Sequence, residues 1–195
     1  MINFRKLFSR LKNKDQKIYL CLSGGGVRAM AFHTGVLKYL AQNEMLNRID
    51  SISSVSAGSL LTGFIFSKNS LCWPEDQSFI NETLPLIKET LLSGDLLKKM
   101  KNITFEPNID SWFNRANRLS ACIKEVWGIE QQMGDVLSGP NWIINTTCAE
   151  TGTRFYFFDK NFIGYRYGRF DSSNIYISDA LAMSSALPFY IGPYI

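Results

Sequence analysis

Apolar residues occur in short runs and at helical spacing along the chain, and the order of these patterns predicts an α/β fold. Residues 17–22 are a short apolar run that predicts a buried strand. The Ser-Gly-Gly-Gly sequence at 23–26 breaks this run, and residues 27–40 follow with helical spacing. A second strand is predicted over residues 49–55, and the apolar run 60–66 predicts a helix after it. A strand, loop and helix that lead into another strand imply a parallel pair.

The second half of the chain predicts helices first and then strands. Helical spacing covers Phe79–Lys99, with an interruption at Gly94, and resumes over Ser111–Trp127. We take residues 68–140 as a helical insertion, which is typical of a lid or a substrate wall. Strands are predicted at 141–147, 153–158 and 162–167, followed by a helix over 177–187 that Pro188 ends.

The N-terminus is basic and amphipathic. Phe4, Leu7, Phe8 and Leu11 recur at helical spacing, and residues 1–20 hold six Lys and Arg residues against Asp15, a local charge of +5. We interpret residues 1–16 as an extension and residues 17–195 as one domain. The extension is either a helix that lies on an anionic membrane surface or an arm that docks on its own domain. With a total charge of +4, the other residues sum to −1, which argues against nucleic acid as a partner of the main body.

The amino-acid composition argues against membrane-spanning, secreted and metal-binding classes of protein. Hydrophobic residues make up 46% and charged residues 19%, values typical of a globular domain, and no apolar run approaches the roughly 20 residues of a membrane span. The N-terminus lacks the apolar core of a signal peptide. The four cysteines, Cys21, Cys72, Cys122 and Cys148, show no metal-ligand spacing. We therefore expect reduced thiols, no metal, no cofactor and a cytoplasmic location.

Two small-residue segments carry candidate chemistry. Ser54-Val55-Ser56-Ala57-Gly58 lies between the second strand and its helix, and it partly matches the G-x-S-x-G nucleophile elbow, which makes Ser56 the candidate nucleophile. Gly24, Gly25 and Gly26 open a helix after a strand, so their amides favour an anion. The chain lacks G-x-x-x-x-G-K-[ST], and Ala29 replaces the third glycine of G-x-G-x-x-G. An oxyanion hole for Ser56 therefore suits this loop better than a phosphate site does.

The sequence offers two kinds of candidate for the base that would activate Ser56. Arg28, in the first helical turn, opposes the helix dipole, so it either holds the glycine loop, meets a substrate phosphate or is simply exposed. The single histidine, His33, lies inside a helix between Phe32 and Val36, which favours packing. The base is then either His33 or a carboxylate that acts directly on the serine.

The combination of these segments resembles the patatin-like phospholipase family. The sequences Ser-Gly-Gly-Gly-Val-Arg-Ala at 23–29 and Ser-Val-Ser-Ala-Gly-Ser at 54–59 are similar to its oxyanion loop and elbow. Further similar segments are 145–147 with 151–155, and 180–188. The resemblance implies a three-layer α/β sandwich with a mostly parallel sheet, and a lipid acyl hydrolase that cleaves phospholipid acyl esters. It also implies a Ser-Asp dyad and no cofactor. From the basic N-terminal segment we expect peripheral association with the inner membrane surface.

The sequence departs from the family pattern at two places. Ser54 replaces the first glycine of the elbow, and the D-G-[GA] motif that carries the catalytic Asp is absent. Asp179 precedes the expected place, and we interpret it as a helix N-cap. We therefore expect a phospholipase whose Asp lies beyond residue 195, and a chain that is close to inactive alone. The alternatives are a non-catalytic lipid-binding or regulatory module, and a hydrolase or acyltransferase that uses His33. The sequence makes no prediction of lipid class, acyl position, biological role or oligomeric state.

Overall fold

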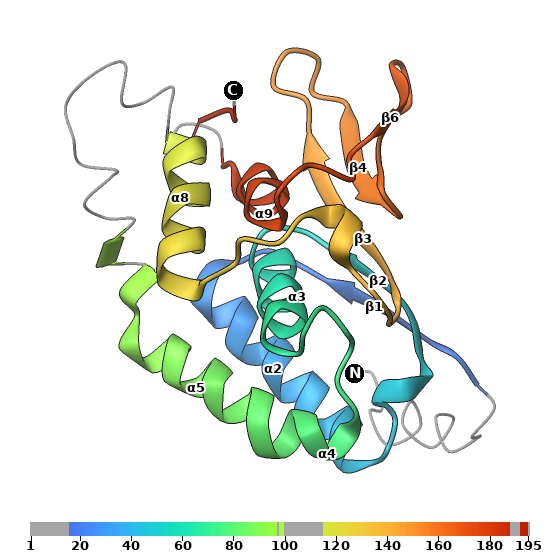
Figure 1. Cartoon of the computed structure of the whole chain (residues 1–195), viewed down its shortest axis with the longest axis vertical. Coiled ribbons are helices and arrows are strands. Elements are labelled where there is room, and N and C mark those ends of the chain that lie inside the picture. Colours follow the sequence, from blue (N-terminus) through green and yellow to red (C-terminus); the bar gives the residue numbers. More distant parts are fainter. Residues whose placement is uncertain (1–15, 97, 100–114, 188–191, 195) are drawn as a thin grey trace, which may run out of the picture.

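The computed structural model describes residues 16–96, 98–99, 115–187 and 192–194, and within them the chain forms one six-stranded mixed sheet with helices beside it (Figure 1). The strands are β1 (Ile18–Leu22), β2 (Ile49–Ser54), β3 (Asn141–Thr147), β4 (Arg154–Phe158), β5 (Asn161–Gly164) and β6 (Gly168–Asp171). The longer helices are α2 (Gly26–Gln42), α3 (Ala57–Lys68), α5 (Leu84–Ser93), α8 (Arg115–Trp127) and α9 (Ile177–Ser185). The short helical segments are η1 (Leu46–Arg48), α4 (Asp76–Ser78), the π-helical η2 (Phe79–Thr83) and η3 (Met133–Asp135).

The strands follow one another across the sheet in chain order. The pairs β1–β2 and β2–β3 are parallel, whereas β3–β4, β4–β5 and β5–β6 are antiparallel. Right-handed crossovers between neighbouring parallel strands place α2 and α3 on the same face of the sheet. The α/β class is confirmed, and the antiparallel half of the mixed sheet is larger than the sequence suggested.

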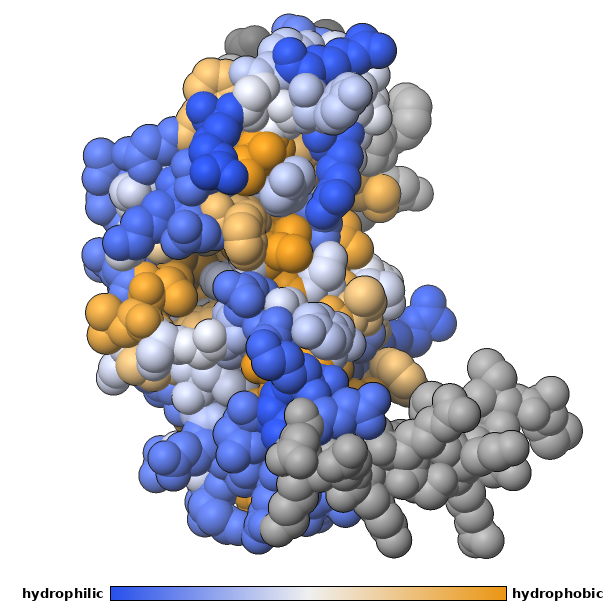
Figure 2. All heavy atoms as spheres, turned by 90° about the vertical axis from the view of Figure 1, so that its right-hand side faces the viewer, coloured by the Kyte–Doolittle hydropathy of each residue, from blue (hydrophilic) through white to orange (hydrophobic). Residues whose placement is uncertain are grey.

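The two faces of the sheet differ in burial. The face under the helices carries Leu22, Ile52, Ile144 and Phe157, all buried in the core. The labelled helices lie to one side of the strands in Figure 1, and Figure 2 views the other side, where hydrophobic side chains gather between hydrophilic ones. The described residues thus supply the sheet and one helical layer of the three-layer sandwich expected from the sequence.

Most expected elements are present, with corrections in the antiparallel half. The strand expected over 162–167 is β5, which ends at Gly164, and the sequence analysis missed β6. Gly164 pairs with Gly168, whose φ of 90° suits glycine and allows a three-residue turn between them. The last helix ends at Ser185 rather than at residue 187.

The insertion follows the expected helices where it is described. Its first helical stretch is interrupted where expected, because Gly94 adopts the left-handed conformation with φ 62° and closes α5. The second stretch contains α8, and residues 100–114 lie outside the described residues. The amphipathic segment 1–14 also lies outside them.

Candidate active site

Ser56 occupies the sharp turn between β2 and α3. Its φ of 53° and ψ of −117° lie in a region that non-glycine residues rarely adopt, at a typical cost of about 1–3 kcal/mol. The turn is held on both sides, because the amide of Val55 donates to Leu22 O (3.1 Å) and the amide of Leu60 donates to Ser56 O (2.9 Å). The Ser56 side chain is partly exposed and makes no hydrogen bond within the described part of the chain. The structure therefore gives Ser56 the strand–turn–helix geometry of a nucleophile elbow.

The turn ends in a glycine, Gly58, because there is no space for a side chain at this position. A Cβ at this position would lie 2.3 Å from the backbone oxygen of Leu22, far inside contact distance. Helix α3 therefore approaches the end of β1 so closely that only glycine fits there. This approach brings the elbow next to the loop that follows β1.

Ser54, which stands where the family pattern has glycine, is part of a buried network of hydroxyl groups. Its Oγ accepts a hydrogen bond from the Trp142 indole (3.0 Å) and lies 2.9 Å from Ser59 Oγ. Ser59 Oγ in turn lies 2.9 Å from Ser184 Oγ on α9. The hydroxyl group of Ser54 is thus hydrogen-bonded by its neighbours. The fold therefore accommodates serine at the position where the family pattern has glycine.

Ser184 connects this network to the backbone of the elbow. Its Oγ accepts the amide N–H of Ser56 (3.0 Å) and donates to the carbonyl oxygen of Asn145 at 2.7 Å. One side chain from α9 therefore joins the strained turn to β3. The sequence analysis quoted the segments that contain Ser184 and Asn145 for the resemblance but gave neither residue a role, because their meeting depends on the tertiary fold.

The glycine loop lies directly against the elbow. A Cβ on Gly24 would be 3.1 Å from Ser56 Cβ and 3.6 Å from Ser56 Oγ. Gly25 caps α2 with a φ of 133°, and Gly26 begins the helix with a φ of 66°. The first amides of a helix have no intrahelical acceptor, so this loop presents N–H groups beside Ser56. The arrangement is suited to an oxyanion formed on a carbon that Ser56 attacks.

His33 and Arg28 have different environments on α2. The His33 ring is buried, and its Nε2 lies 3.0 Å from the carbonyl oxygen of Ser23, at the start of the glycine loop. Arg28 is exposed, and within the described residues it makes no hydrogen bond or ion pair. His33, rather than Arg28, therefore contacts the backbone of the glycine loop within the described residues.

Asp179 is not the helix N-cap that we expected. The N-cap of α9 is Tyr176, which makes no side-chain capping bond, and Asp179 lies in the first turn. Its carboxylate accepts a hydrogen bond from Ser120 on α8 and lies 3.9 Å from Lys124 Nζ. Burial and the Asp179 carboxylate raise the pKa of Tyr194 to about 12. Asp179 thus joins α9 to α8 instead of capping its own helix.

The described residues contain no cluster of three or more His, Cys, Asp or Glu side chains that could hold a metal ion. Among the same residues, no helix combines the length and the apolar character needed to cross a bilayer. The cysteines described there, Cys21, Cys72, Cys122 and Cys148, are unpaired thiols.

Fold and site together define the class of α/β proteins in which a serine at a strand–helix turn faces a glycine loop. The chain belongs to the patatin-like phospholipase family, whose model matches residues 20–195. No curated protein sequence matches the chain.

Solved structures support the fold. The structure of human GIVD cytosolic phospholipase A2 with methyl gamma-linolenyl fluorophosphonate superposes with a TM-score of 0.56 at 14% identity, covering 87% of this chain and 29% of that one. Another structure of human GIVD cytosolic phospholipase A2 gives a TM-score of 0.51 at 12% identity, covering 88% of this chain and 29% of that one. The ExoU–SpcU complex from the type III secretion system of Pseudomonas aeruginosa gives 0.46 at 16% identity, covering 92% and 37%. The chain therefore spans less than a third of the length of the human enzyme.

Proposed function

We propose that this chain carries the nucleophile and the oxyanion donors of a lipid acyl hydrolase that cleaves acyl ester bonds of phospholipids. The observation that carries the proposal is the close approach of Gly24 to Ser56, which puts a loop of helix-opening amides beside the partly exposed Ser56 side chain in a strained turn. Membership of the patatin-like phospholipase family supports the substrate class.

In the proposed reaction, Ser56 Oγ attacks the carbonyl carbon of the acyl ester while an aspartate accepts its proton. The carbonyl oxygen becomes an oxyanion, which the amides of Gly24, Gly25 and Gly26 stabilise by hydrogen bonds. Each such donor is typically worth about 3 kcal/mol in the transition state. The intermediate then expels the lysophospholipid alcohol, which takes the proton from the aspartic acid and leaves an acyl-serine.

Water hydrolyses this acyl-serine in the second half of the reaction. The aspartate accepts a proton from the water, the hydroxide attacks the acyl carbon, and Ser56 Oγ leaves as the hydroxyl after it regains the proton. We propose that this aspartate lies outside the 195 residues, because the chain contains no Asp-Gly pair of the kind that carries it in the family pattern. Asp179 is bound to Ser120 at the far end of α9 from Ser184, which argues against Asp179 as the base. On this proposal the chain alone is close to inactive.

Arg28 is the proposed contact for the phospholipid head group. It lies two residues beyond Gly26, is exposed, and has no ionic partner within the described residues, so a substrate phosphate would supply one. We propose a cytoplasmic protein that associates peripherally with the inner membrane surface, in keeping with its unpaired cysteines.

The test uses the full-length protein with phospholipid vesicles and with a fluorophosphonate, a reagent class that phosphonylates activated serines. We expect release of fatty acid, and one phosphonyl group on Ser56 by peptide mass spectrometry. Ser56→Ala should abolish both signals. The matched control is Ser67→Ala, because Ser67 lies on the same helix and bonds only its own Phe64 carbonyl.

Three results would contradict the proposal. Hydrolysis that survives in Ser56→Ala would exclude Ser56 as the nucleophile. Vesicle binding by the full-length protein without hydrolysis or labelling would instead favour a non-catalytic lipid-binding module. Activity that disappears in His33→Ala while folding and loop geometry persist would favour His33 as the base.

A further inference from the structure

The turn between β5 and β6, together with β6 itself, carries basic and aromatic side chains that are exposed. Tyr165 is 98% exposed, Tyr167 is 46% exposed and Phe170 is 51% exposed. Arg166 and Arg169 are also exposed and form no ion pair within the part of the chain that the structure describes. No acidic residue occurs between Lys160 and Phe170. We call residues 164–170 the aromatic–arginine hairpin.

Aromatic rings on the neighbouring strand β4 and on β5 support the hairpin. The Phe155 ring stacks on Phe162 at 4.8 Å and on Tyr167 at 5.3 Å between centroids. The same ring lies over Gly164, where an added Cβ would be 2.4 Å from it. The exposed tip is therefore part of a turn that packs against the sheet.

The hairpin lies at the same edge of the sheet as Ser56. Strands β1, β2 and β3 are parallel, and β5 runs in the same direction because it is separated from β3 by two antiparallel steps. Through the register, Ser54 is level with Ile144, Phe157 and Phe162. The tip at Tyr165–Tyr167 starts three residues past Phe162, about 10 Å beyond this level, and is displaced from β2 by three strand spacings, about 14 Å. Figure 1 shows the β5–β6 connection rising beside the β3–β4 loop at this edge.

We infer that the aromatic–arginine hairpin docks on the surface of an anionic phospholipid bilayer and so orients the edge that carries Ser56 toward the lipid. The inference rests on the proposed function, because this orientation matters only if Ser56 acts on phospholipid. Tyrosine rings favour the head-group region, where an apolar ring meets a polar environment. Arg166 and Arg169 supply the charge that anionic head groups attract, and their stems can lie along apolar surface. Arg154 is not part of this surface, because it donates to Asn145 Oδ1 (2.8 Å) and covers the Tyr156 ring.

The experiment measures flotation of the chain with vesicles of phosphatidylcholine alone and of phosphatidylcholine mixed with phosphatidylglycerol. We expect binding to the mixed vesicles, weakened by about 30-fold or more in Arg166→Glu/Arg169→Glu, since each basic residue near an anionic surface contributes about fivefold. Tyr165→Ser should weaken binding by a smaller factor. The control is Lys38→Glu/Lys88→Glu, an equal change of charge at exposed positions on α2 and α5, which should bind like the unaltered chain. The basic N-terminal segment is present in every variant and therefore cancels from the comparison.

Unaltered binding in the hairpin variant would overturn the inference, and so would an equal loss in the Lys38→Glu/Lys88→Glu control, which would indicate bulk charge only. A failure of the proposed function is recognised separately. In the full-length protein, the hairpin variant should still hydrolyse a soluble short-chain ester while its hydrolysis of anionic vesicles falls. If the unaltered full-length protein hydrolyses neither substrate, the proposed function fails, and the flotation result still decides the docking surface.

Discussion

The parallel and antiparallel halves of the sheet are stabilised by different kinds of contact. In the parallel half, backbone approaches backbone at Gly58, and the elbow is fixed by hydroxyl groups of Ser54, Ser59 and Ser184. In the antiparallel half, the hairpin is supported by stacked aromatic rings over a glycine, and its outer strand β6 is exposed along its whole length. The first kind of contact sets the position of one backbone turn, whereas the second supports a protruding surface.

This difference assigns separate tasks to the two halves. A nucleophile must hold its geometry closely, since a misplacement of about 1 Å can cost about 100-fold in rate. A docking surface needs exposure and charge more than accurate placement. The predictions that follow test whether the halves respond differently to comparable substitutions.

The largest expected effect is that of Gly58→Ala. The added methyl group meets the Leu22 carbonyl at 2.3 Å, and neither backbone segment can move without shifting α3 from β1. We expect a loss in the free energy of unfolding on the order of 3 kcal/mol, measured by urea denaturation. Gly35→Ala is the control, because Gly35 is a helical glycine with open space around its Cβ position, and it should gain about 0.5–1 kcal/mol. Equal free energies of unfolding for the two variants would contradict the close approach of α3 to the end of β1.

Ser184→Ala should come next. It leaves the partly buried amide of Ser56 without its acceptor, at an expected cost of about 1–3 kcal/mol. In the full-length protein, fluorophosphonate labelling of Ser56 should also slow by about 10- to 100-fold, because the strained turn loses its support. Ser185→Ala is the matched control, since the neighbouring Ser185 Oγ is buried without a partner within the described residues. A control that slows labelling as much as Ser184→Ala would contradict a positioning role.

Gly164→Ala gives the corresponding test in the antiparallel half. Its methyl group meets the Phe155 ring at 2.4 Å, but a side chain can move where a backbone cannot. We expect a smaller loss than in Gly58→Ala, about 1–2 kcal/mol by urea denaturation, with unchanged labelling of Ser56 in the full-length protein. A loss of labelling here would mean that the two halves are not independent.

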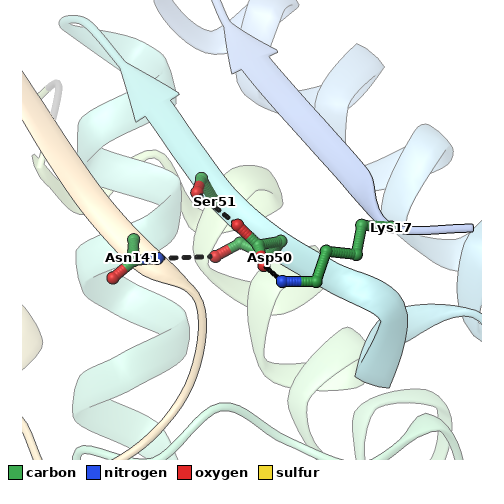
Figure 3. Close-up of polar contacts among 4 residues, drawn as sticks. All are labelled: Lys17, Asp50, Ser51 and Asn141. Carbon is green, nitrogen blue, oxygen red and sulfur yellow. Dashed lines mark hydrogen bonds and ion pairs between the residues drawn. The ribbon is translucent and has the colours of Figure 1, made fainter.

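The smallest effect concerns the opposite end of the parallel strands, where Lys17 Nζ lies 2.5 Å from Asp50 Oδ1 and Asn141 donates to the Asp50 carbonyl (Figure 3). The hydrogen bond from Lys17 lowers the pKa of Asp50 below its usual 3.8. The folded state therefore favours the carboxylate, and this stabilisation is present above pH 3.8 and is lost as pH falls through the lowered pKa. The same hydrogen bond raises the pKa of Lys17 above its usual 10.5. The stabilisation that Lys17 contributes is therefore present below pH 10.5 and is lost as pH rises through the raised pKa.

Asp50→Asn should remove a small part of the acid dependence of the urea midpoint and leave the midpoint near that of the unaltered chain once the pH has fallen below the lowered pKa of Asp50. Because both side chains are solvent-accessible, salt should reduce the difference. A difference between the two proteins that persists unchanged at the lowest pH would refute this origin.

The candidate site could be located from the sequence to a large extent. Apolar runs at 17–22 and 49–55 predicted β1 and β2, and the small residues after each run indicated the loop and the turn that now lie in contact. The sequence analysis could not find the support of the elbow, because Ser184 is 128 residues from the amide that it binds. It also misjudged Asp179, because the partner of this carboxylate is Ser120 on another helix, which no local capping rule includes.

What the sequence by itself determined is local. Periodicity fixed the strand–loop–helix units, and glycine and serine marked the positions where the backbone must turn sharply or approach closely. The tertiary structure alone decided which of these positions meet, because strand order and register depend on packing over the whole sheet. It joined Gly24 to Ser56, gave Ser54 its partners at Trp142 and Ser59, and brought the aromatic–arginine hairpin to the edge that holds the candidate nucleophile.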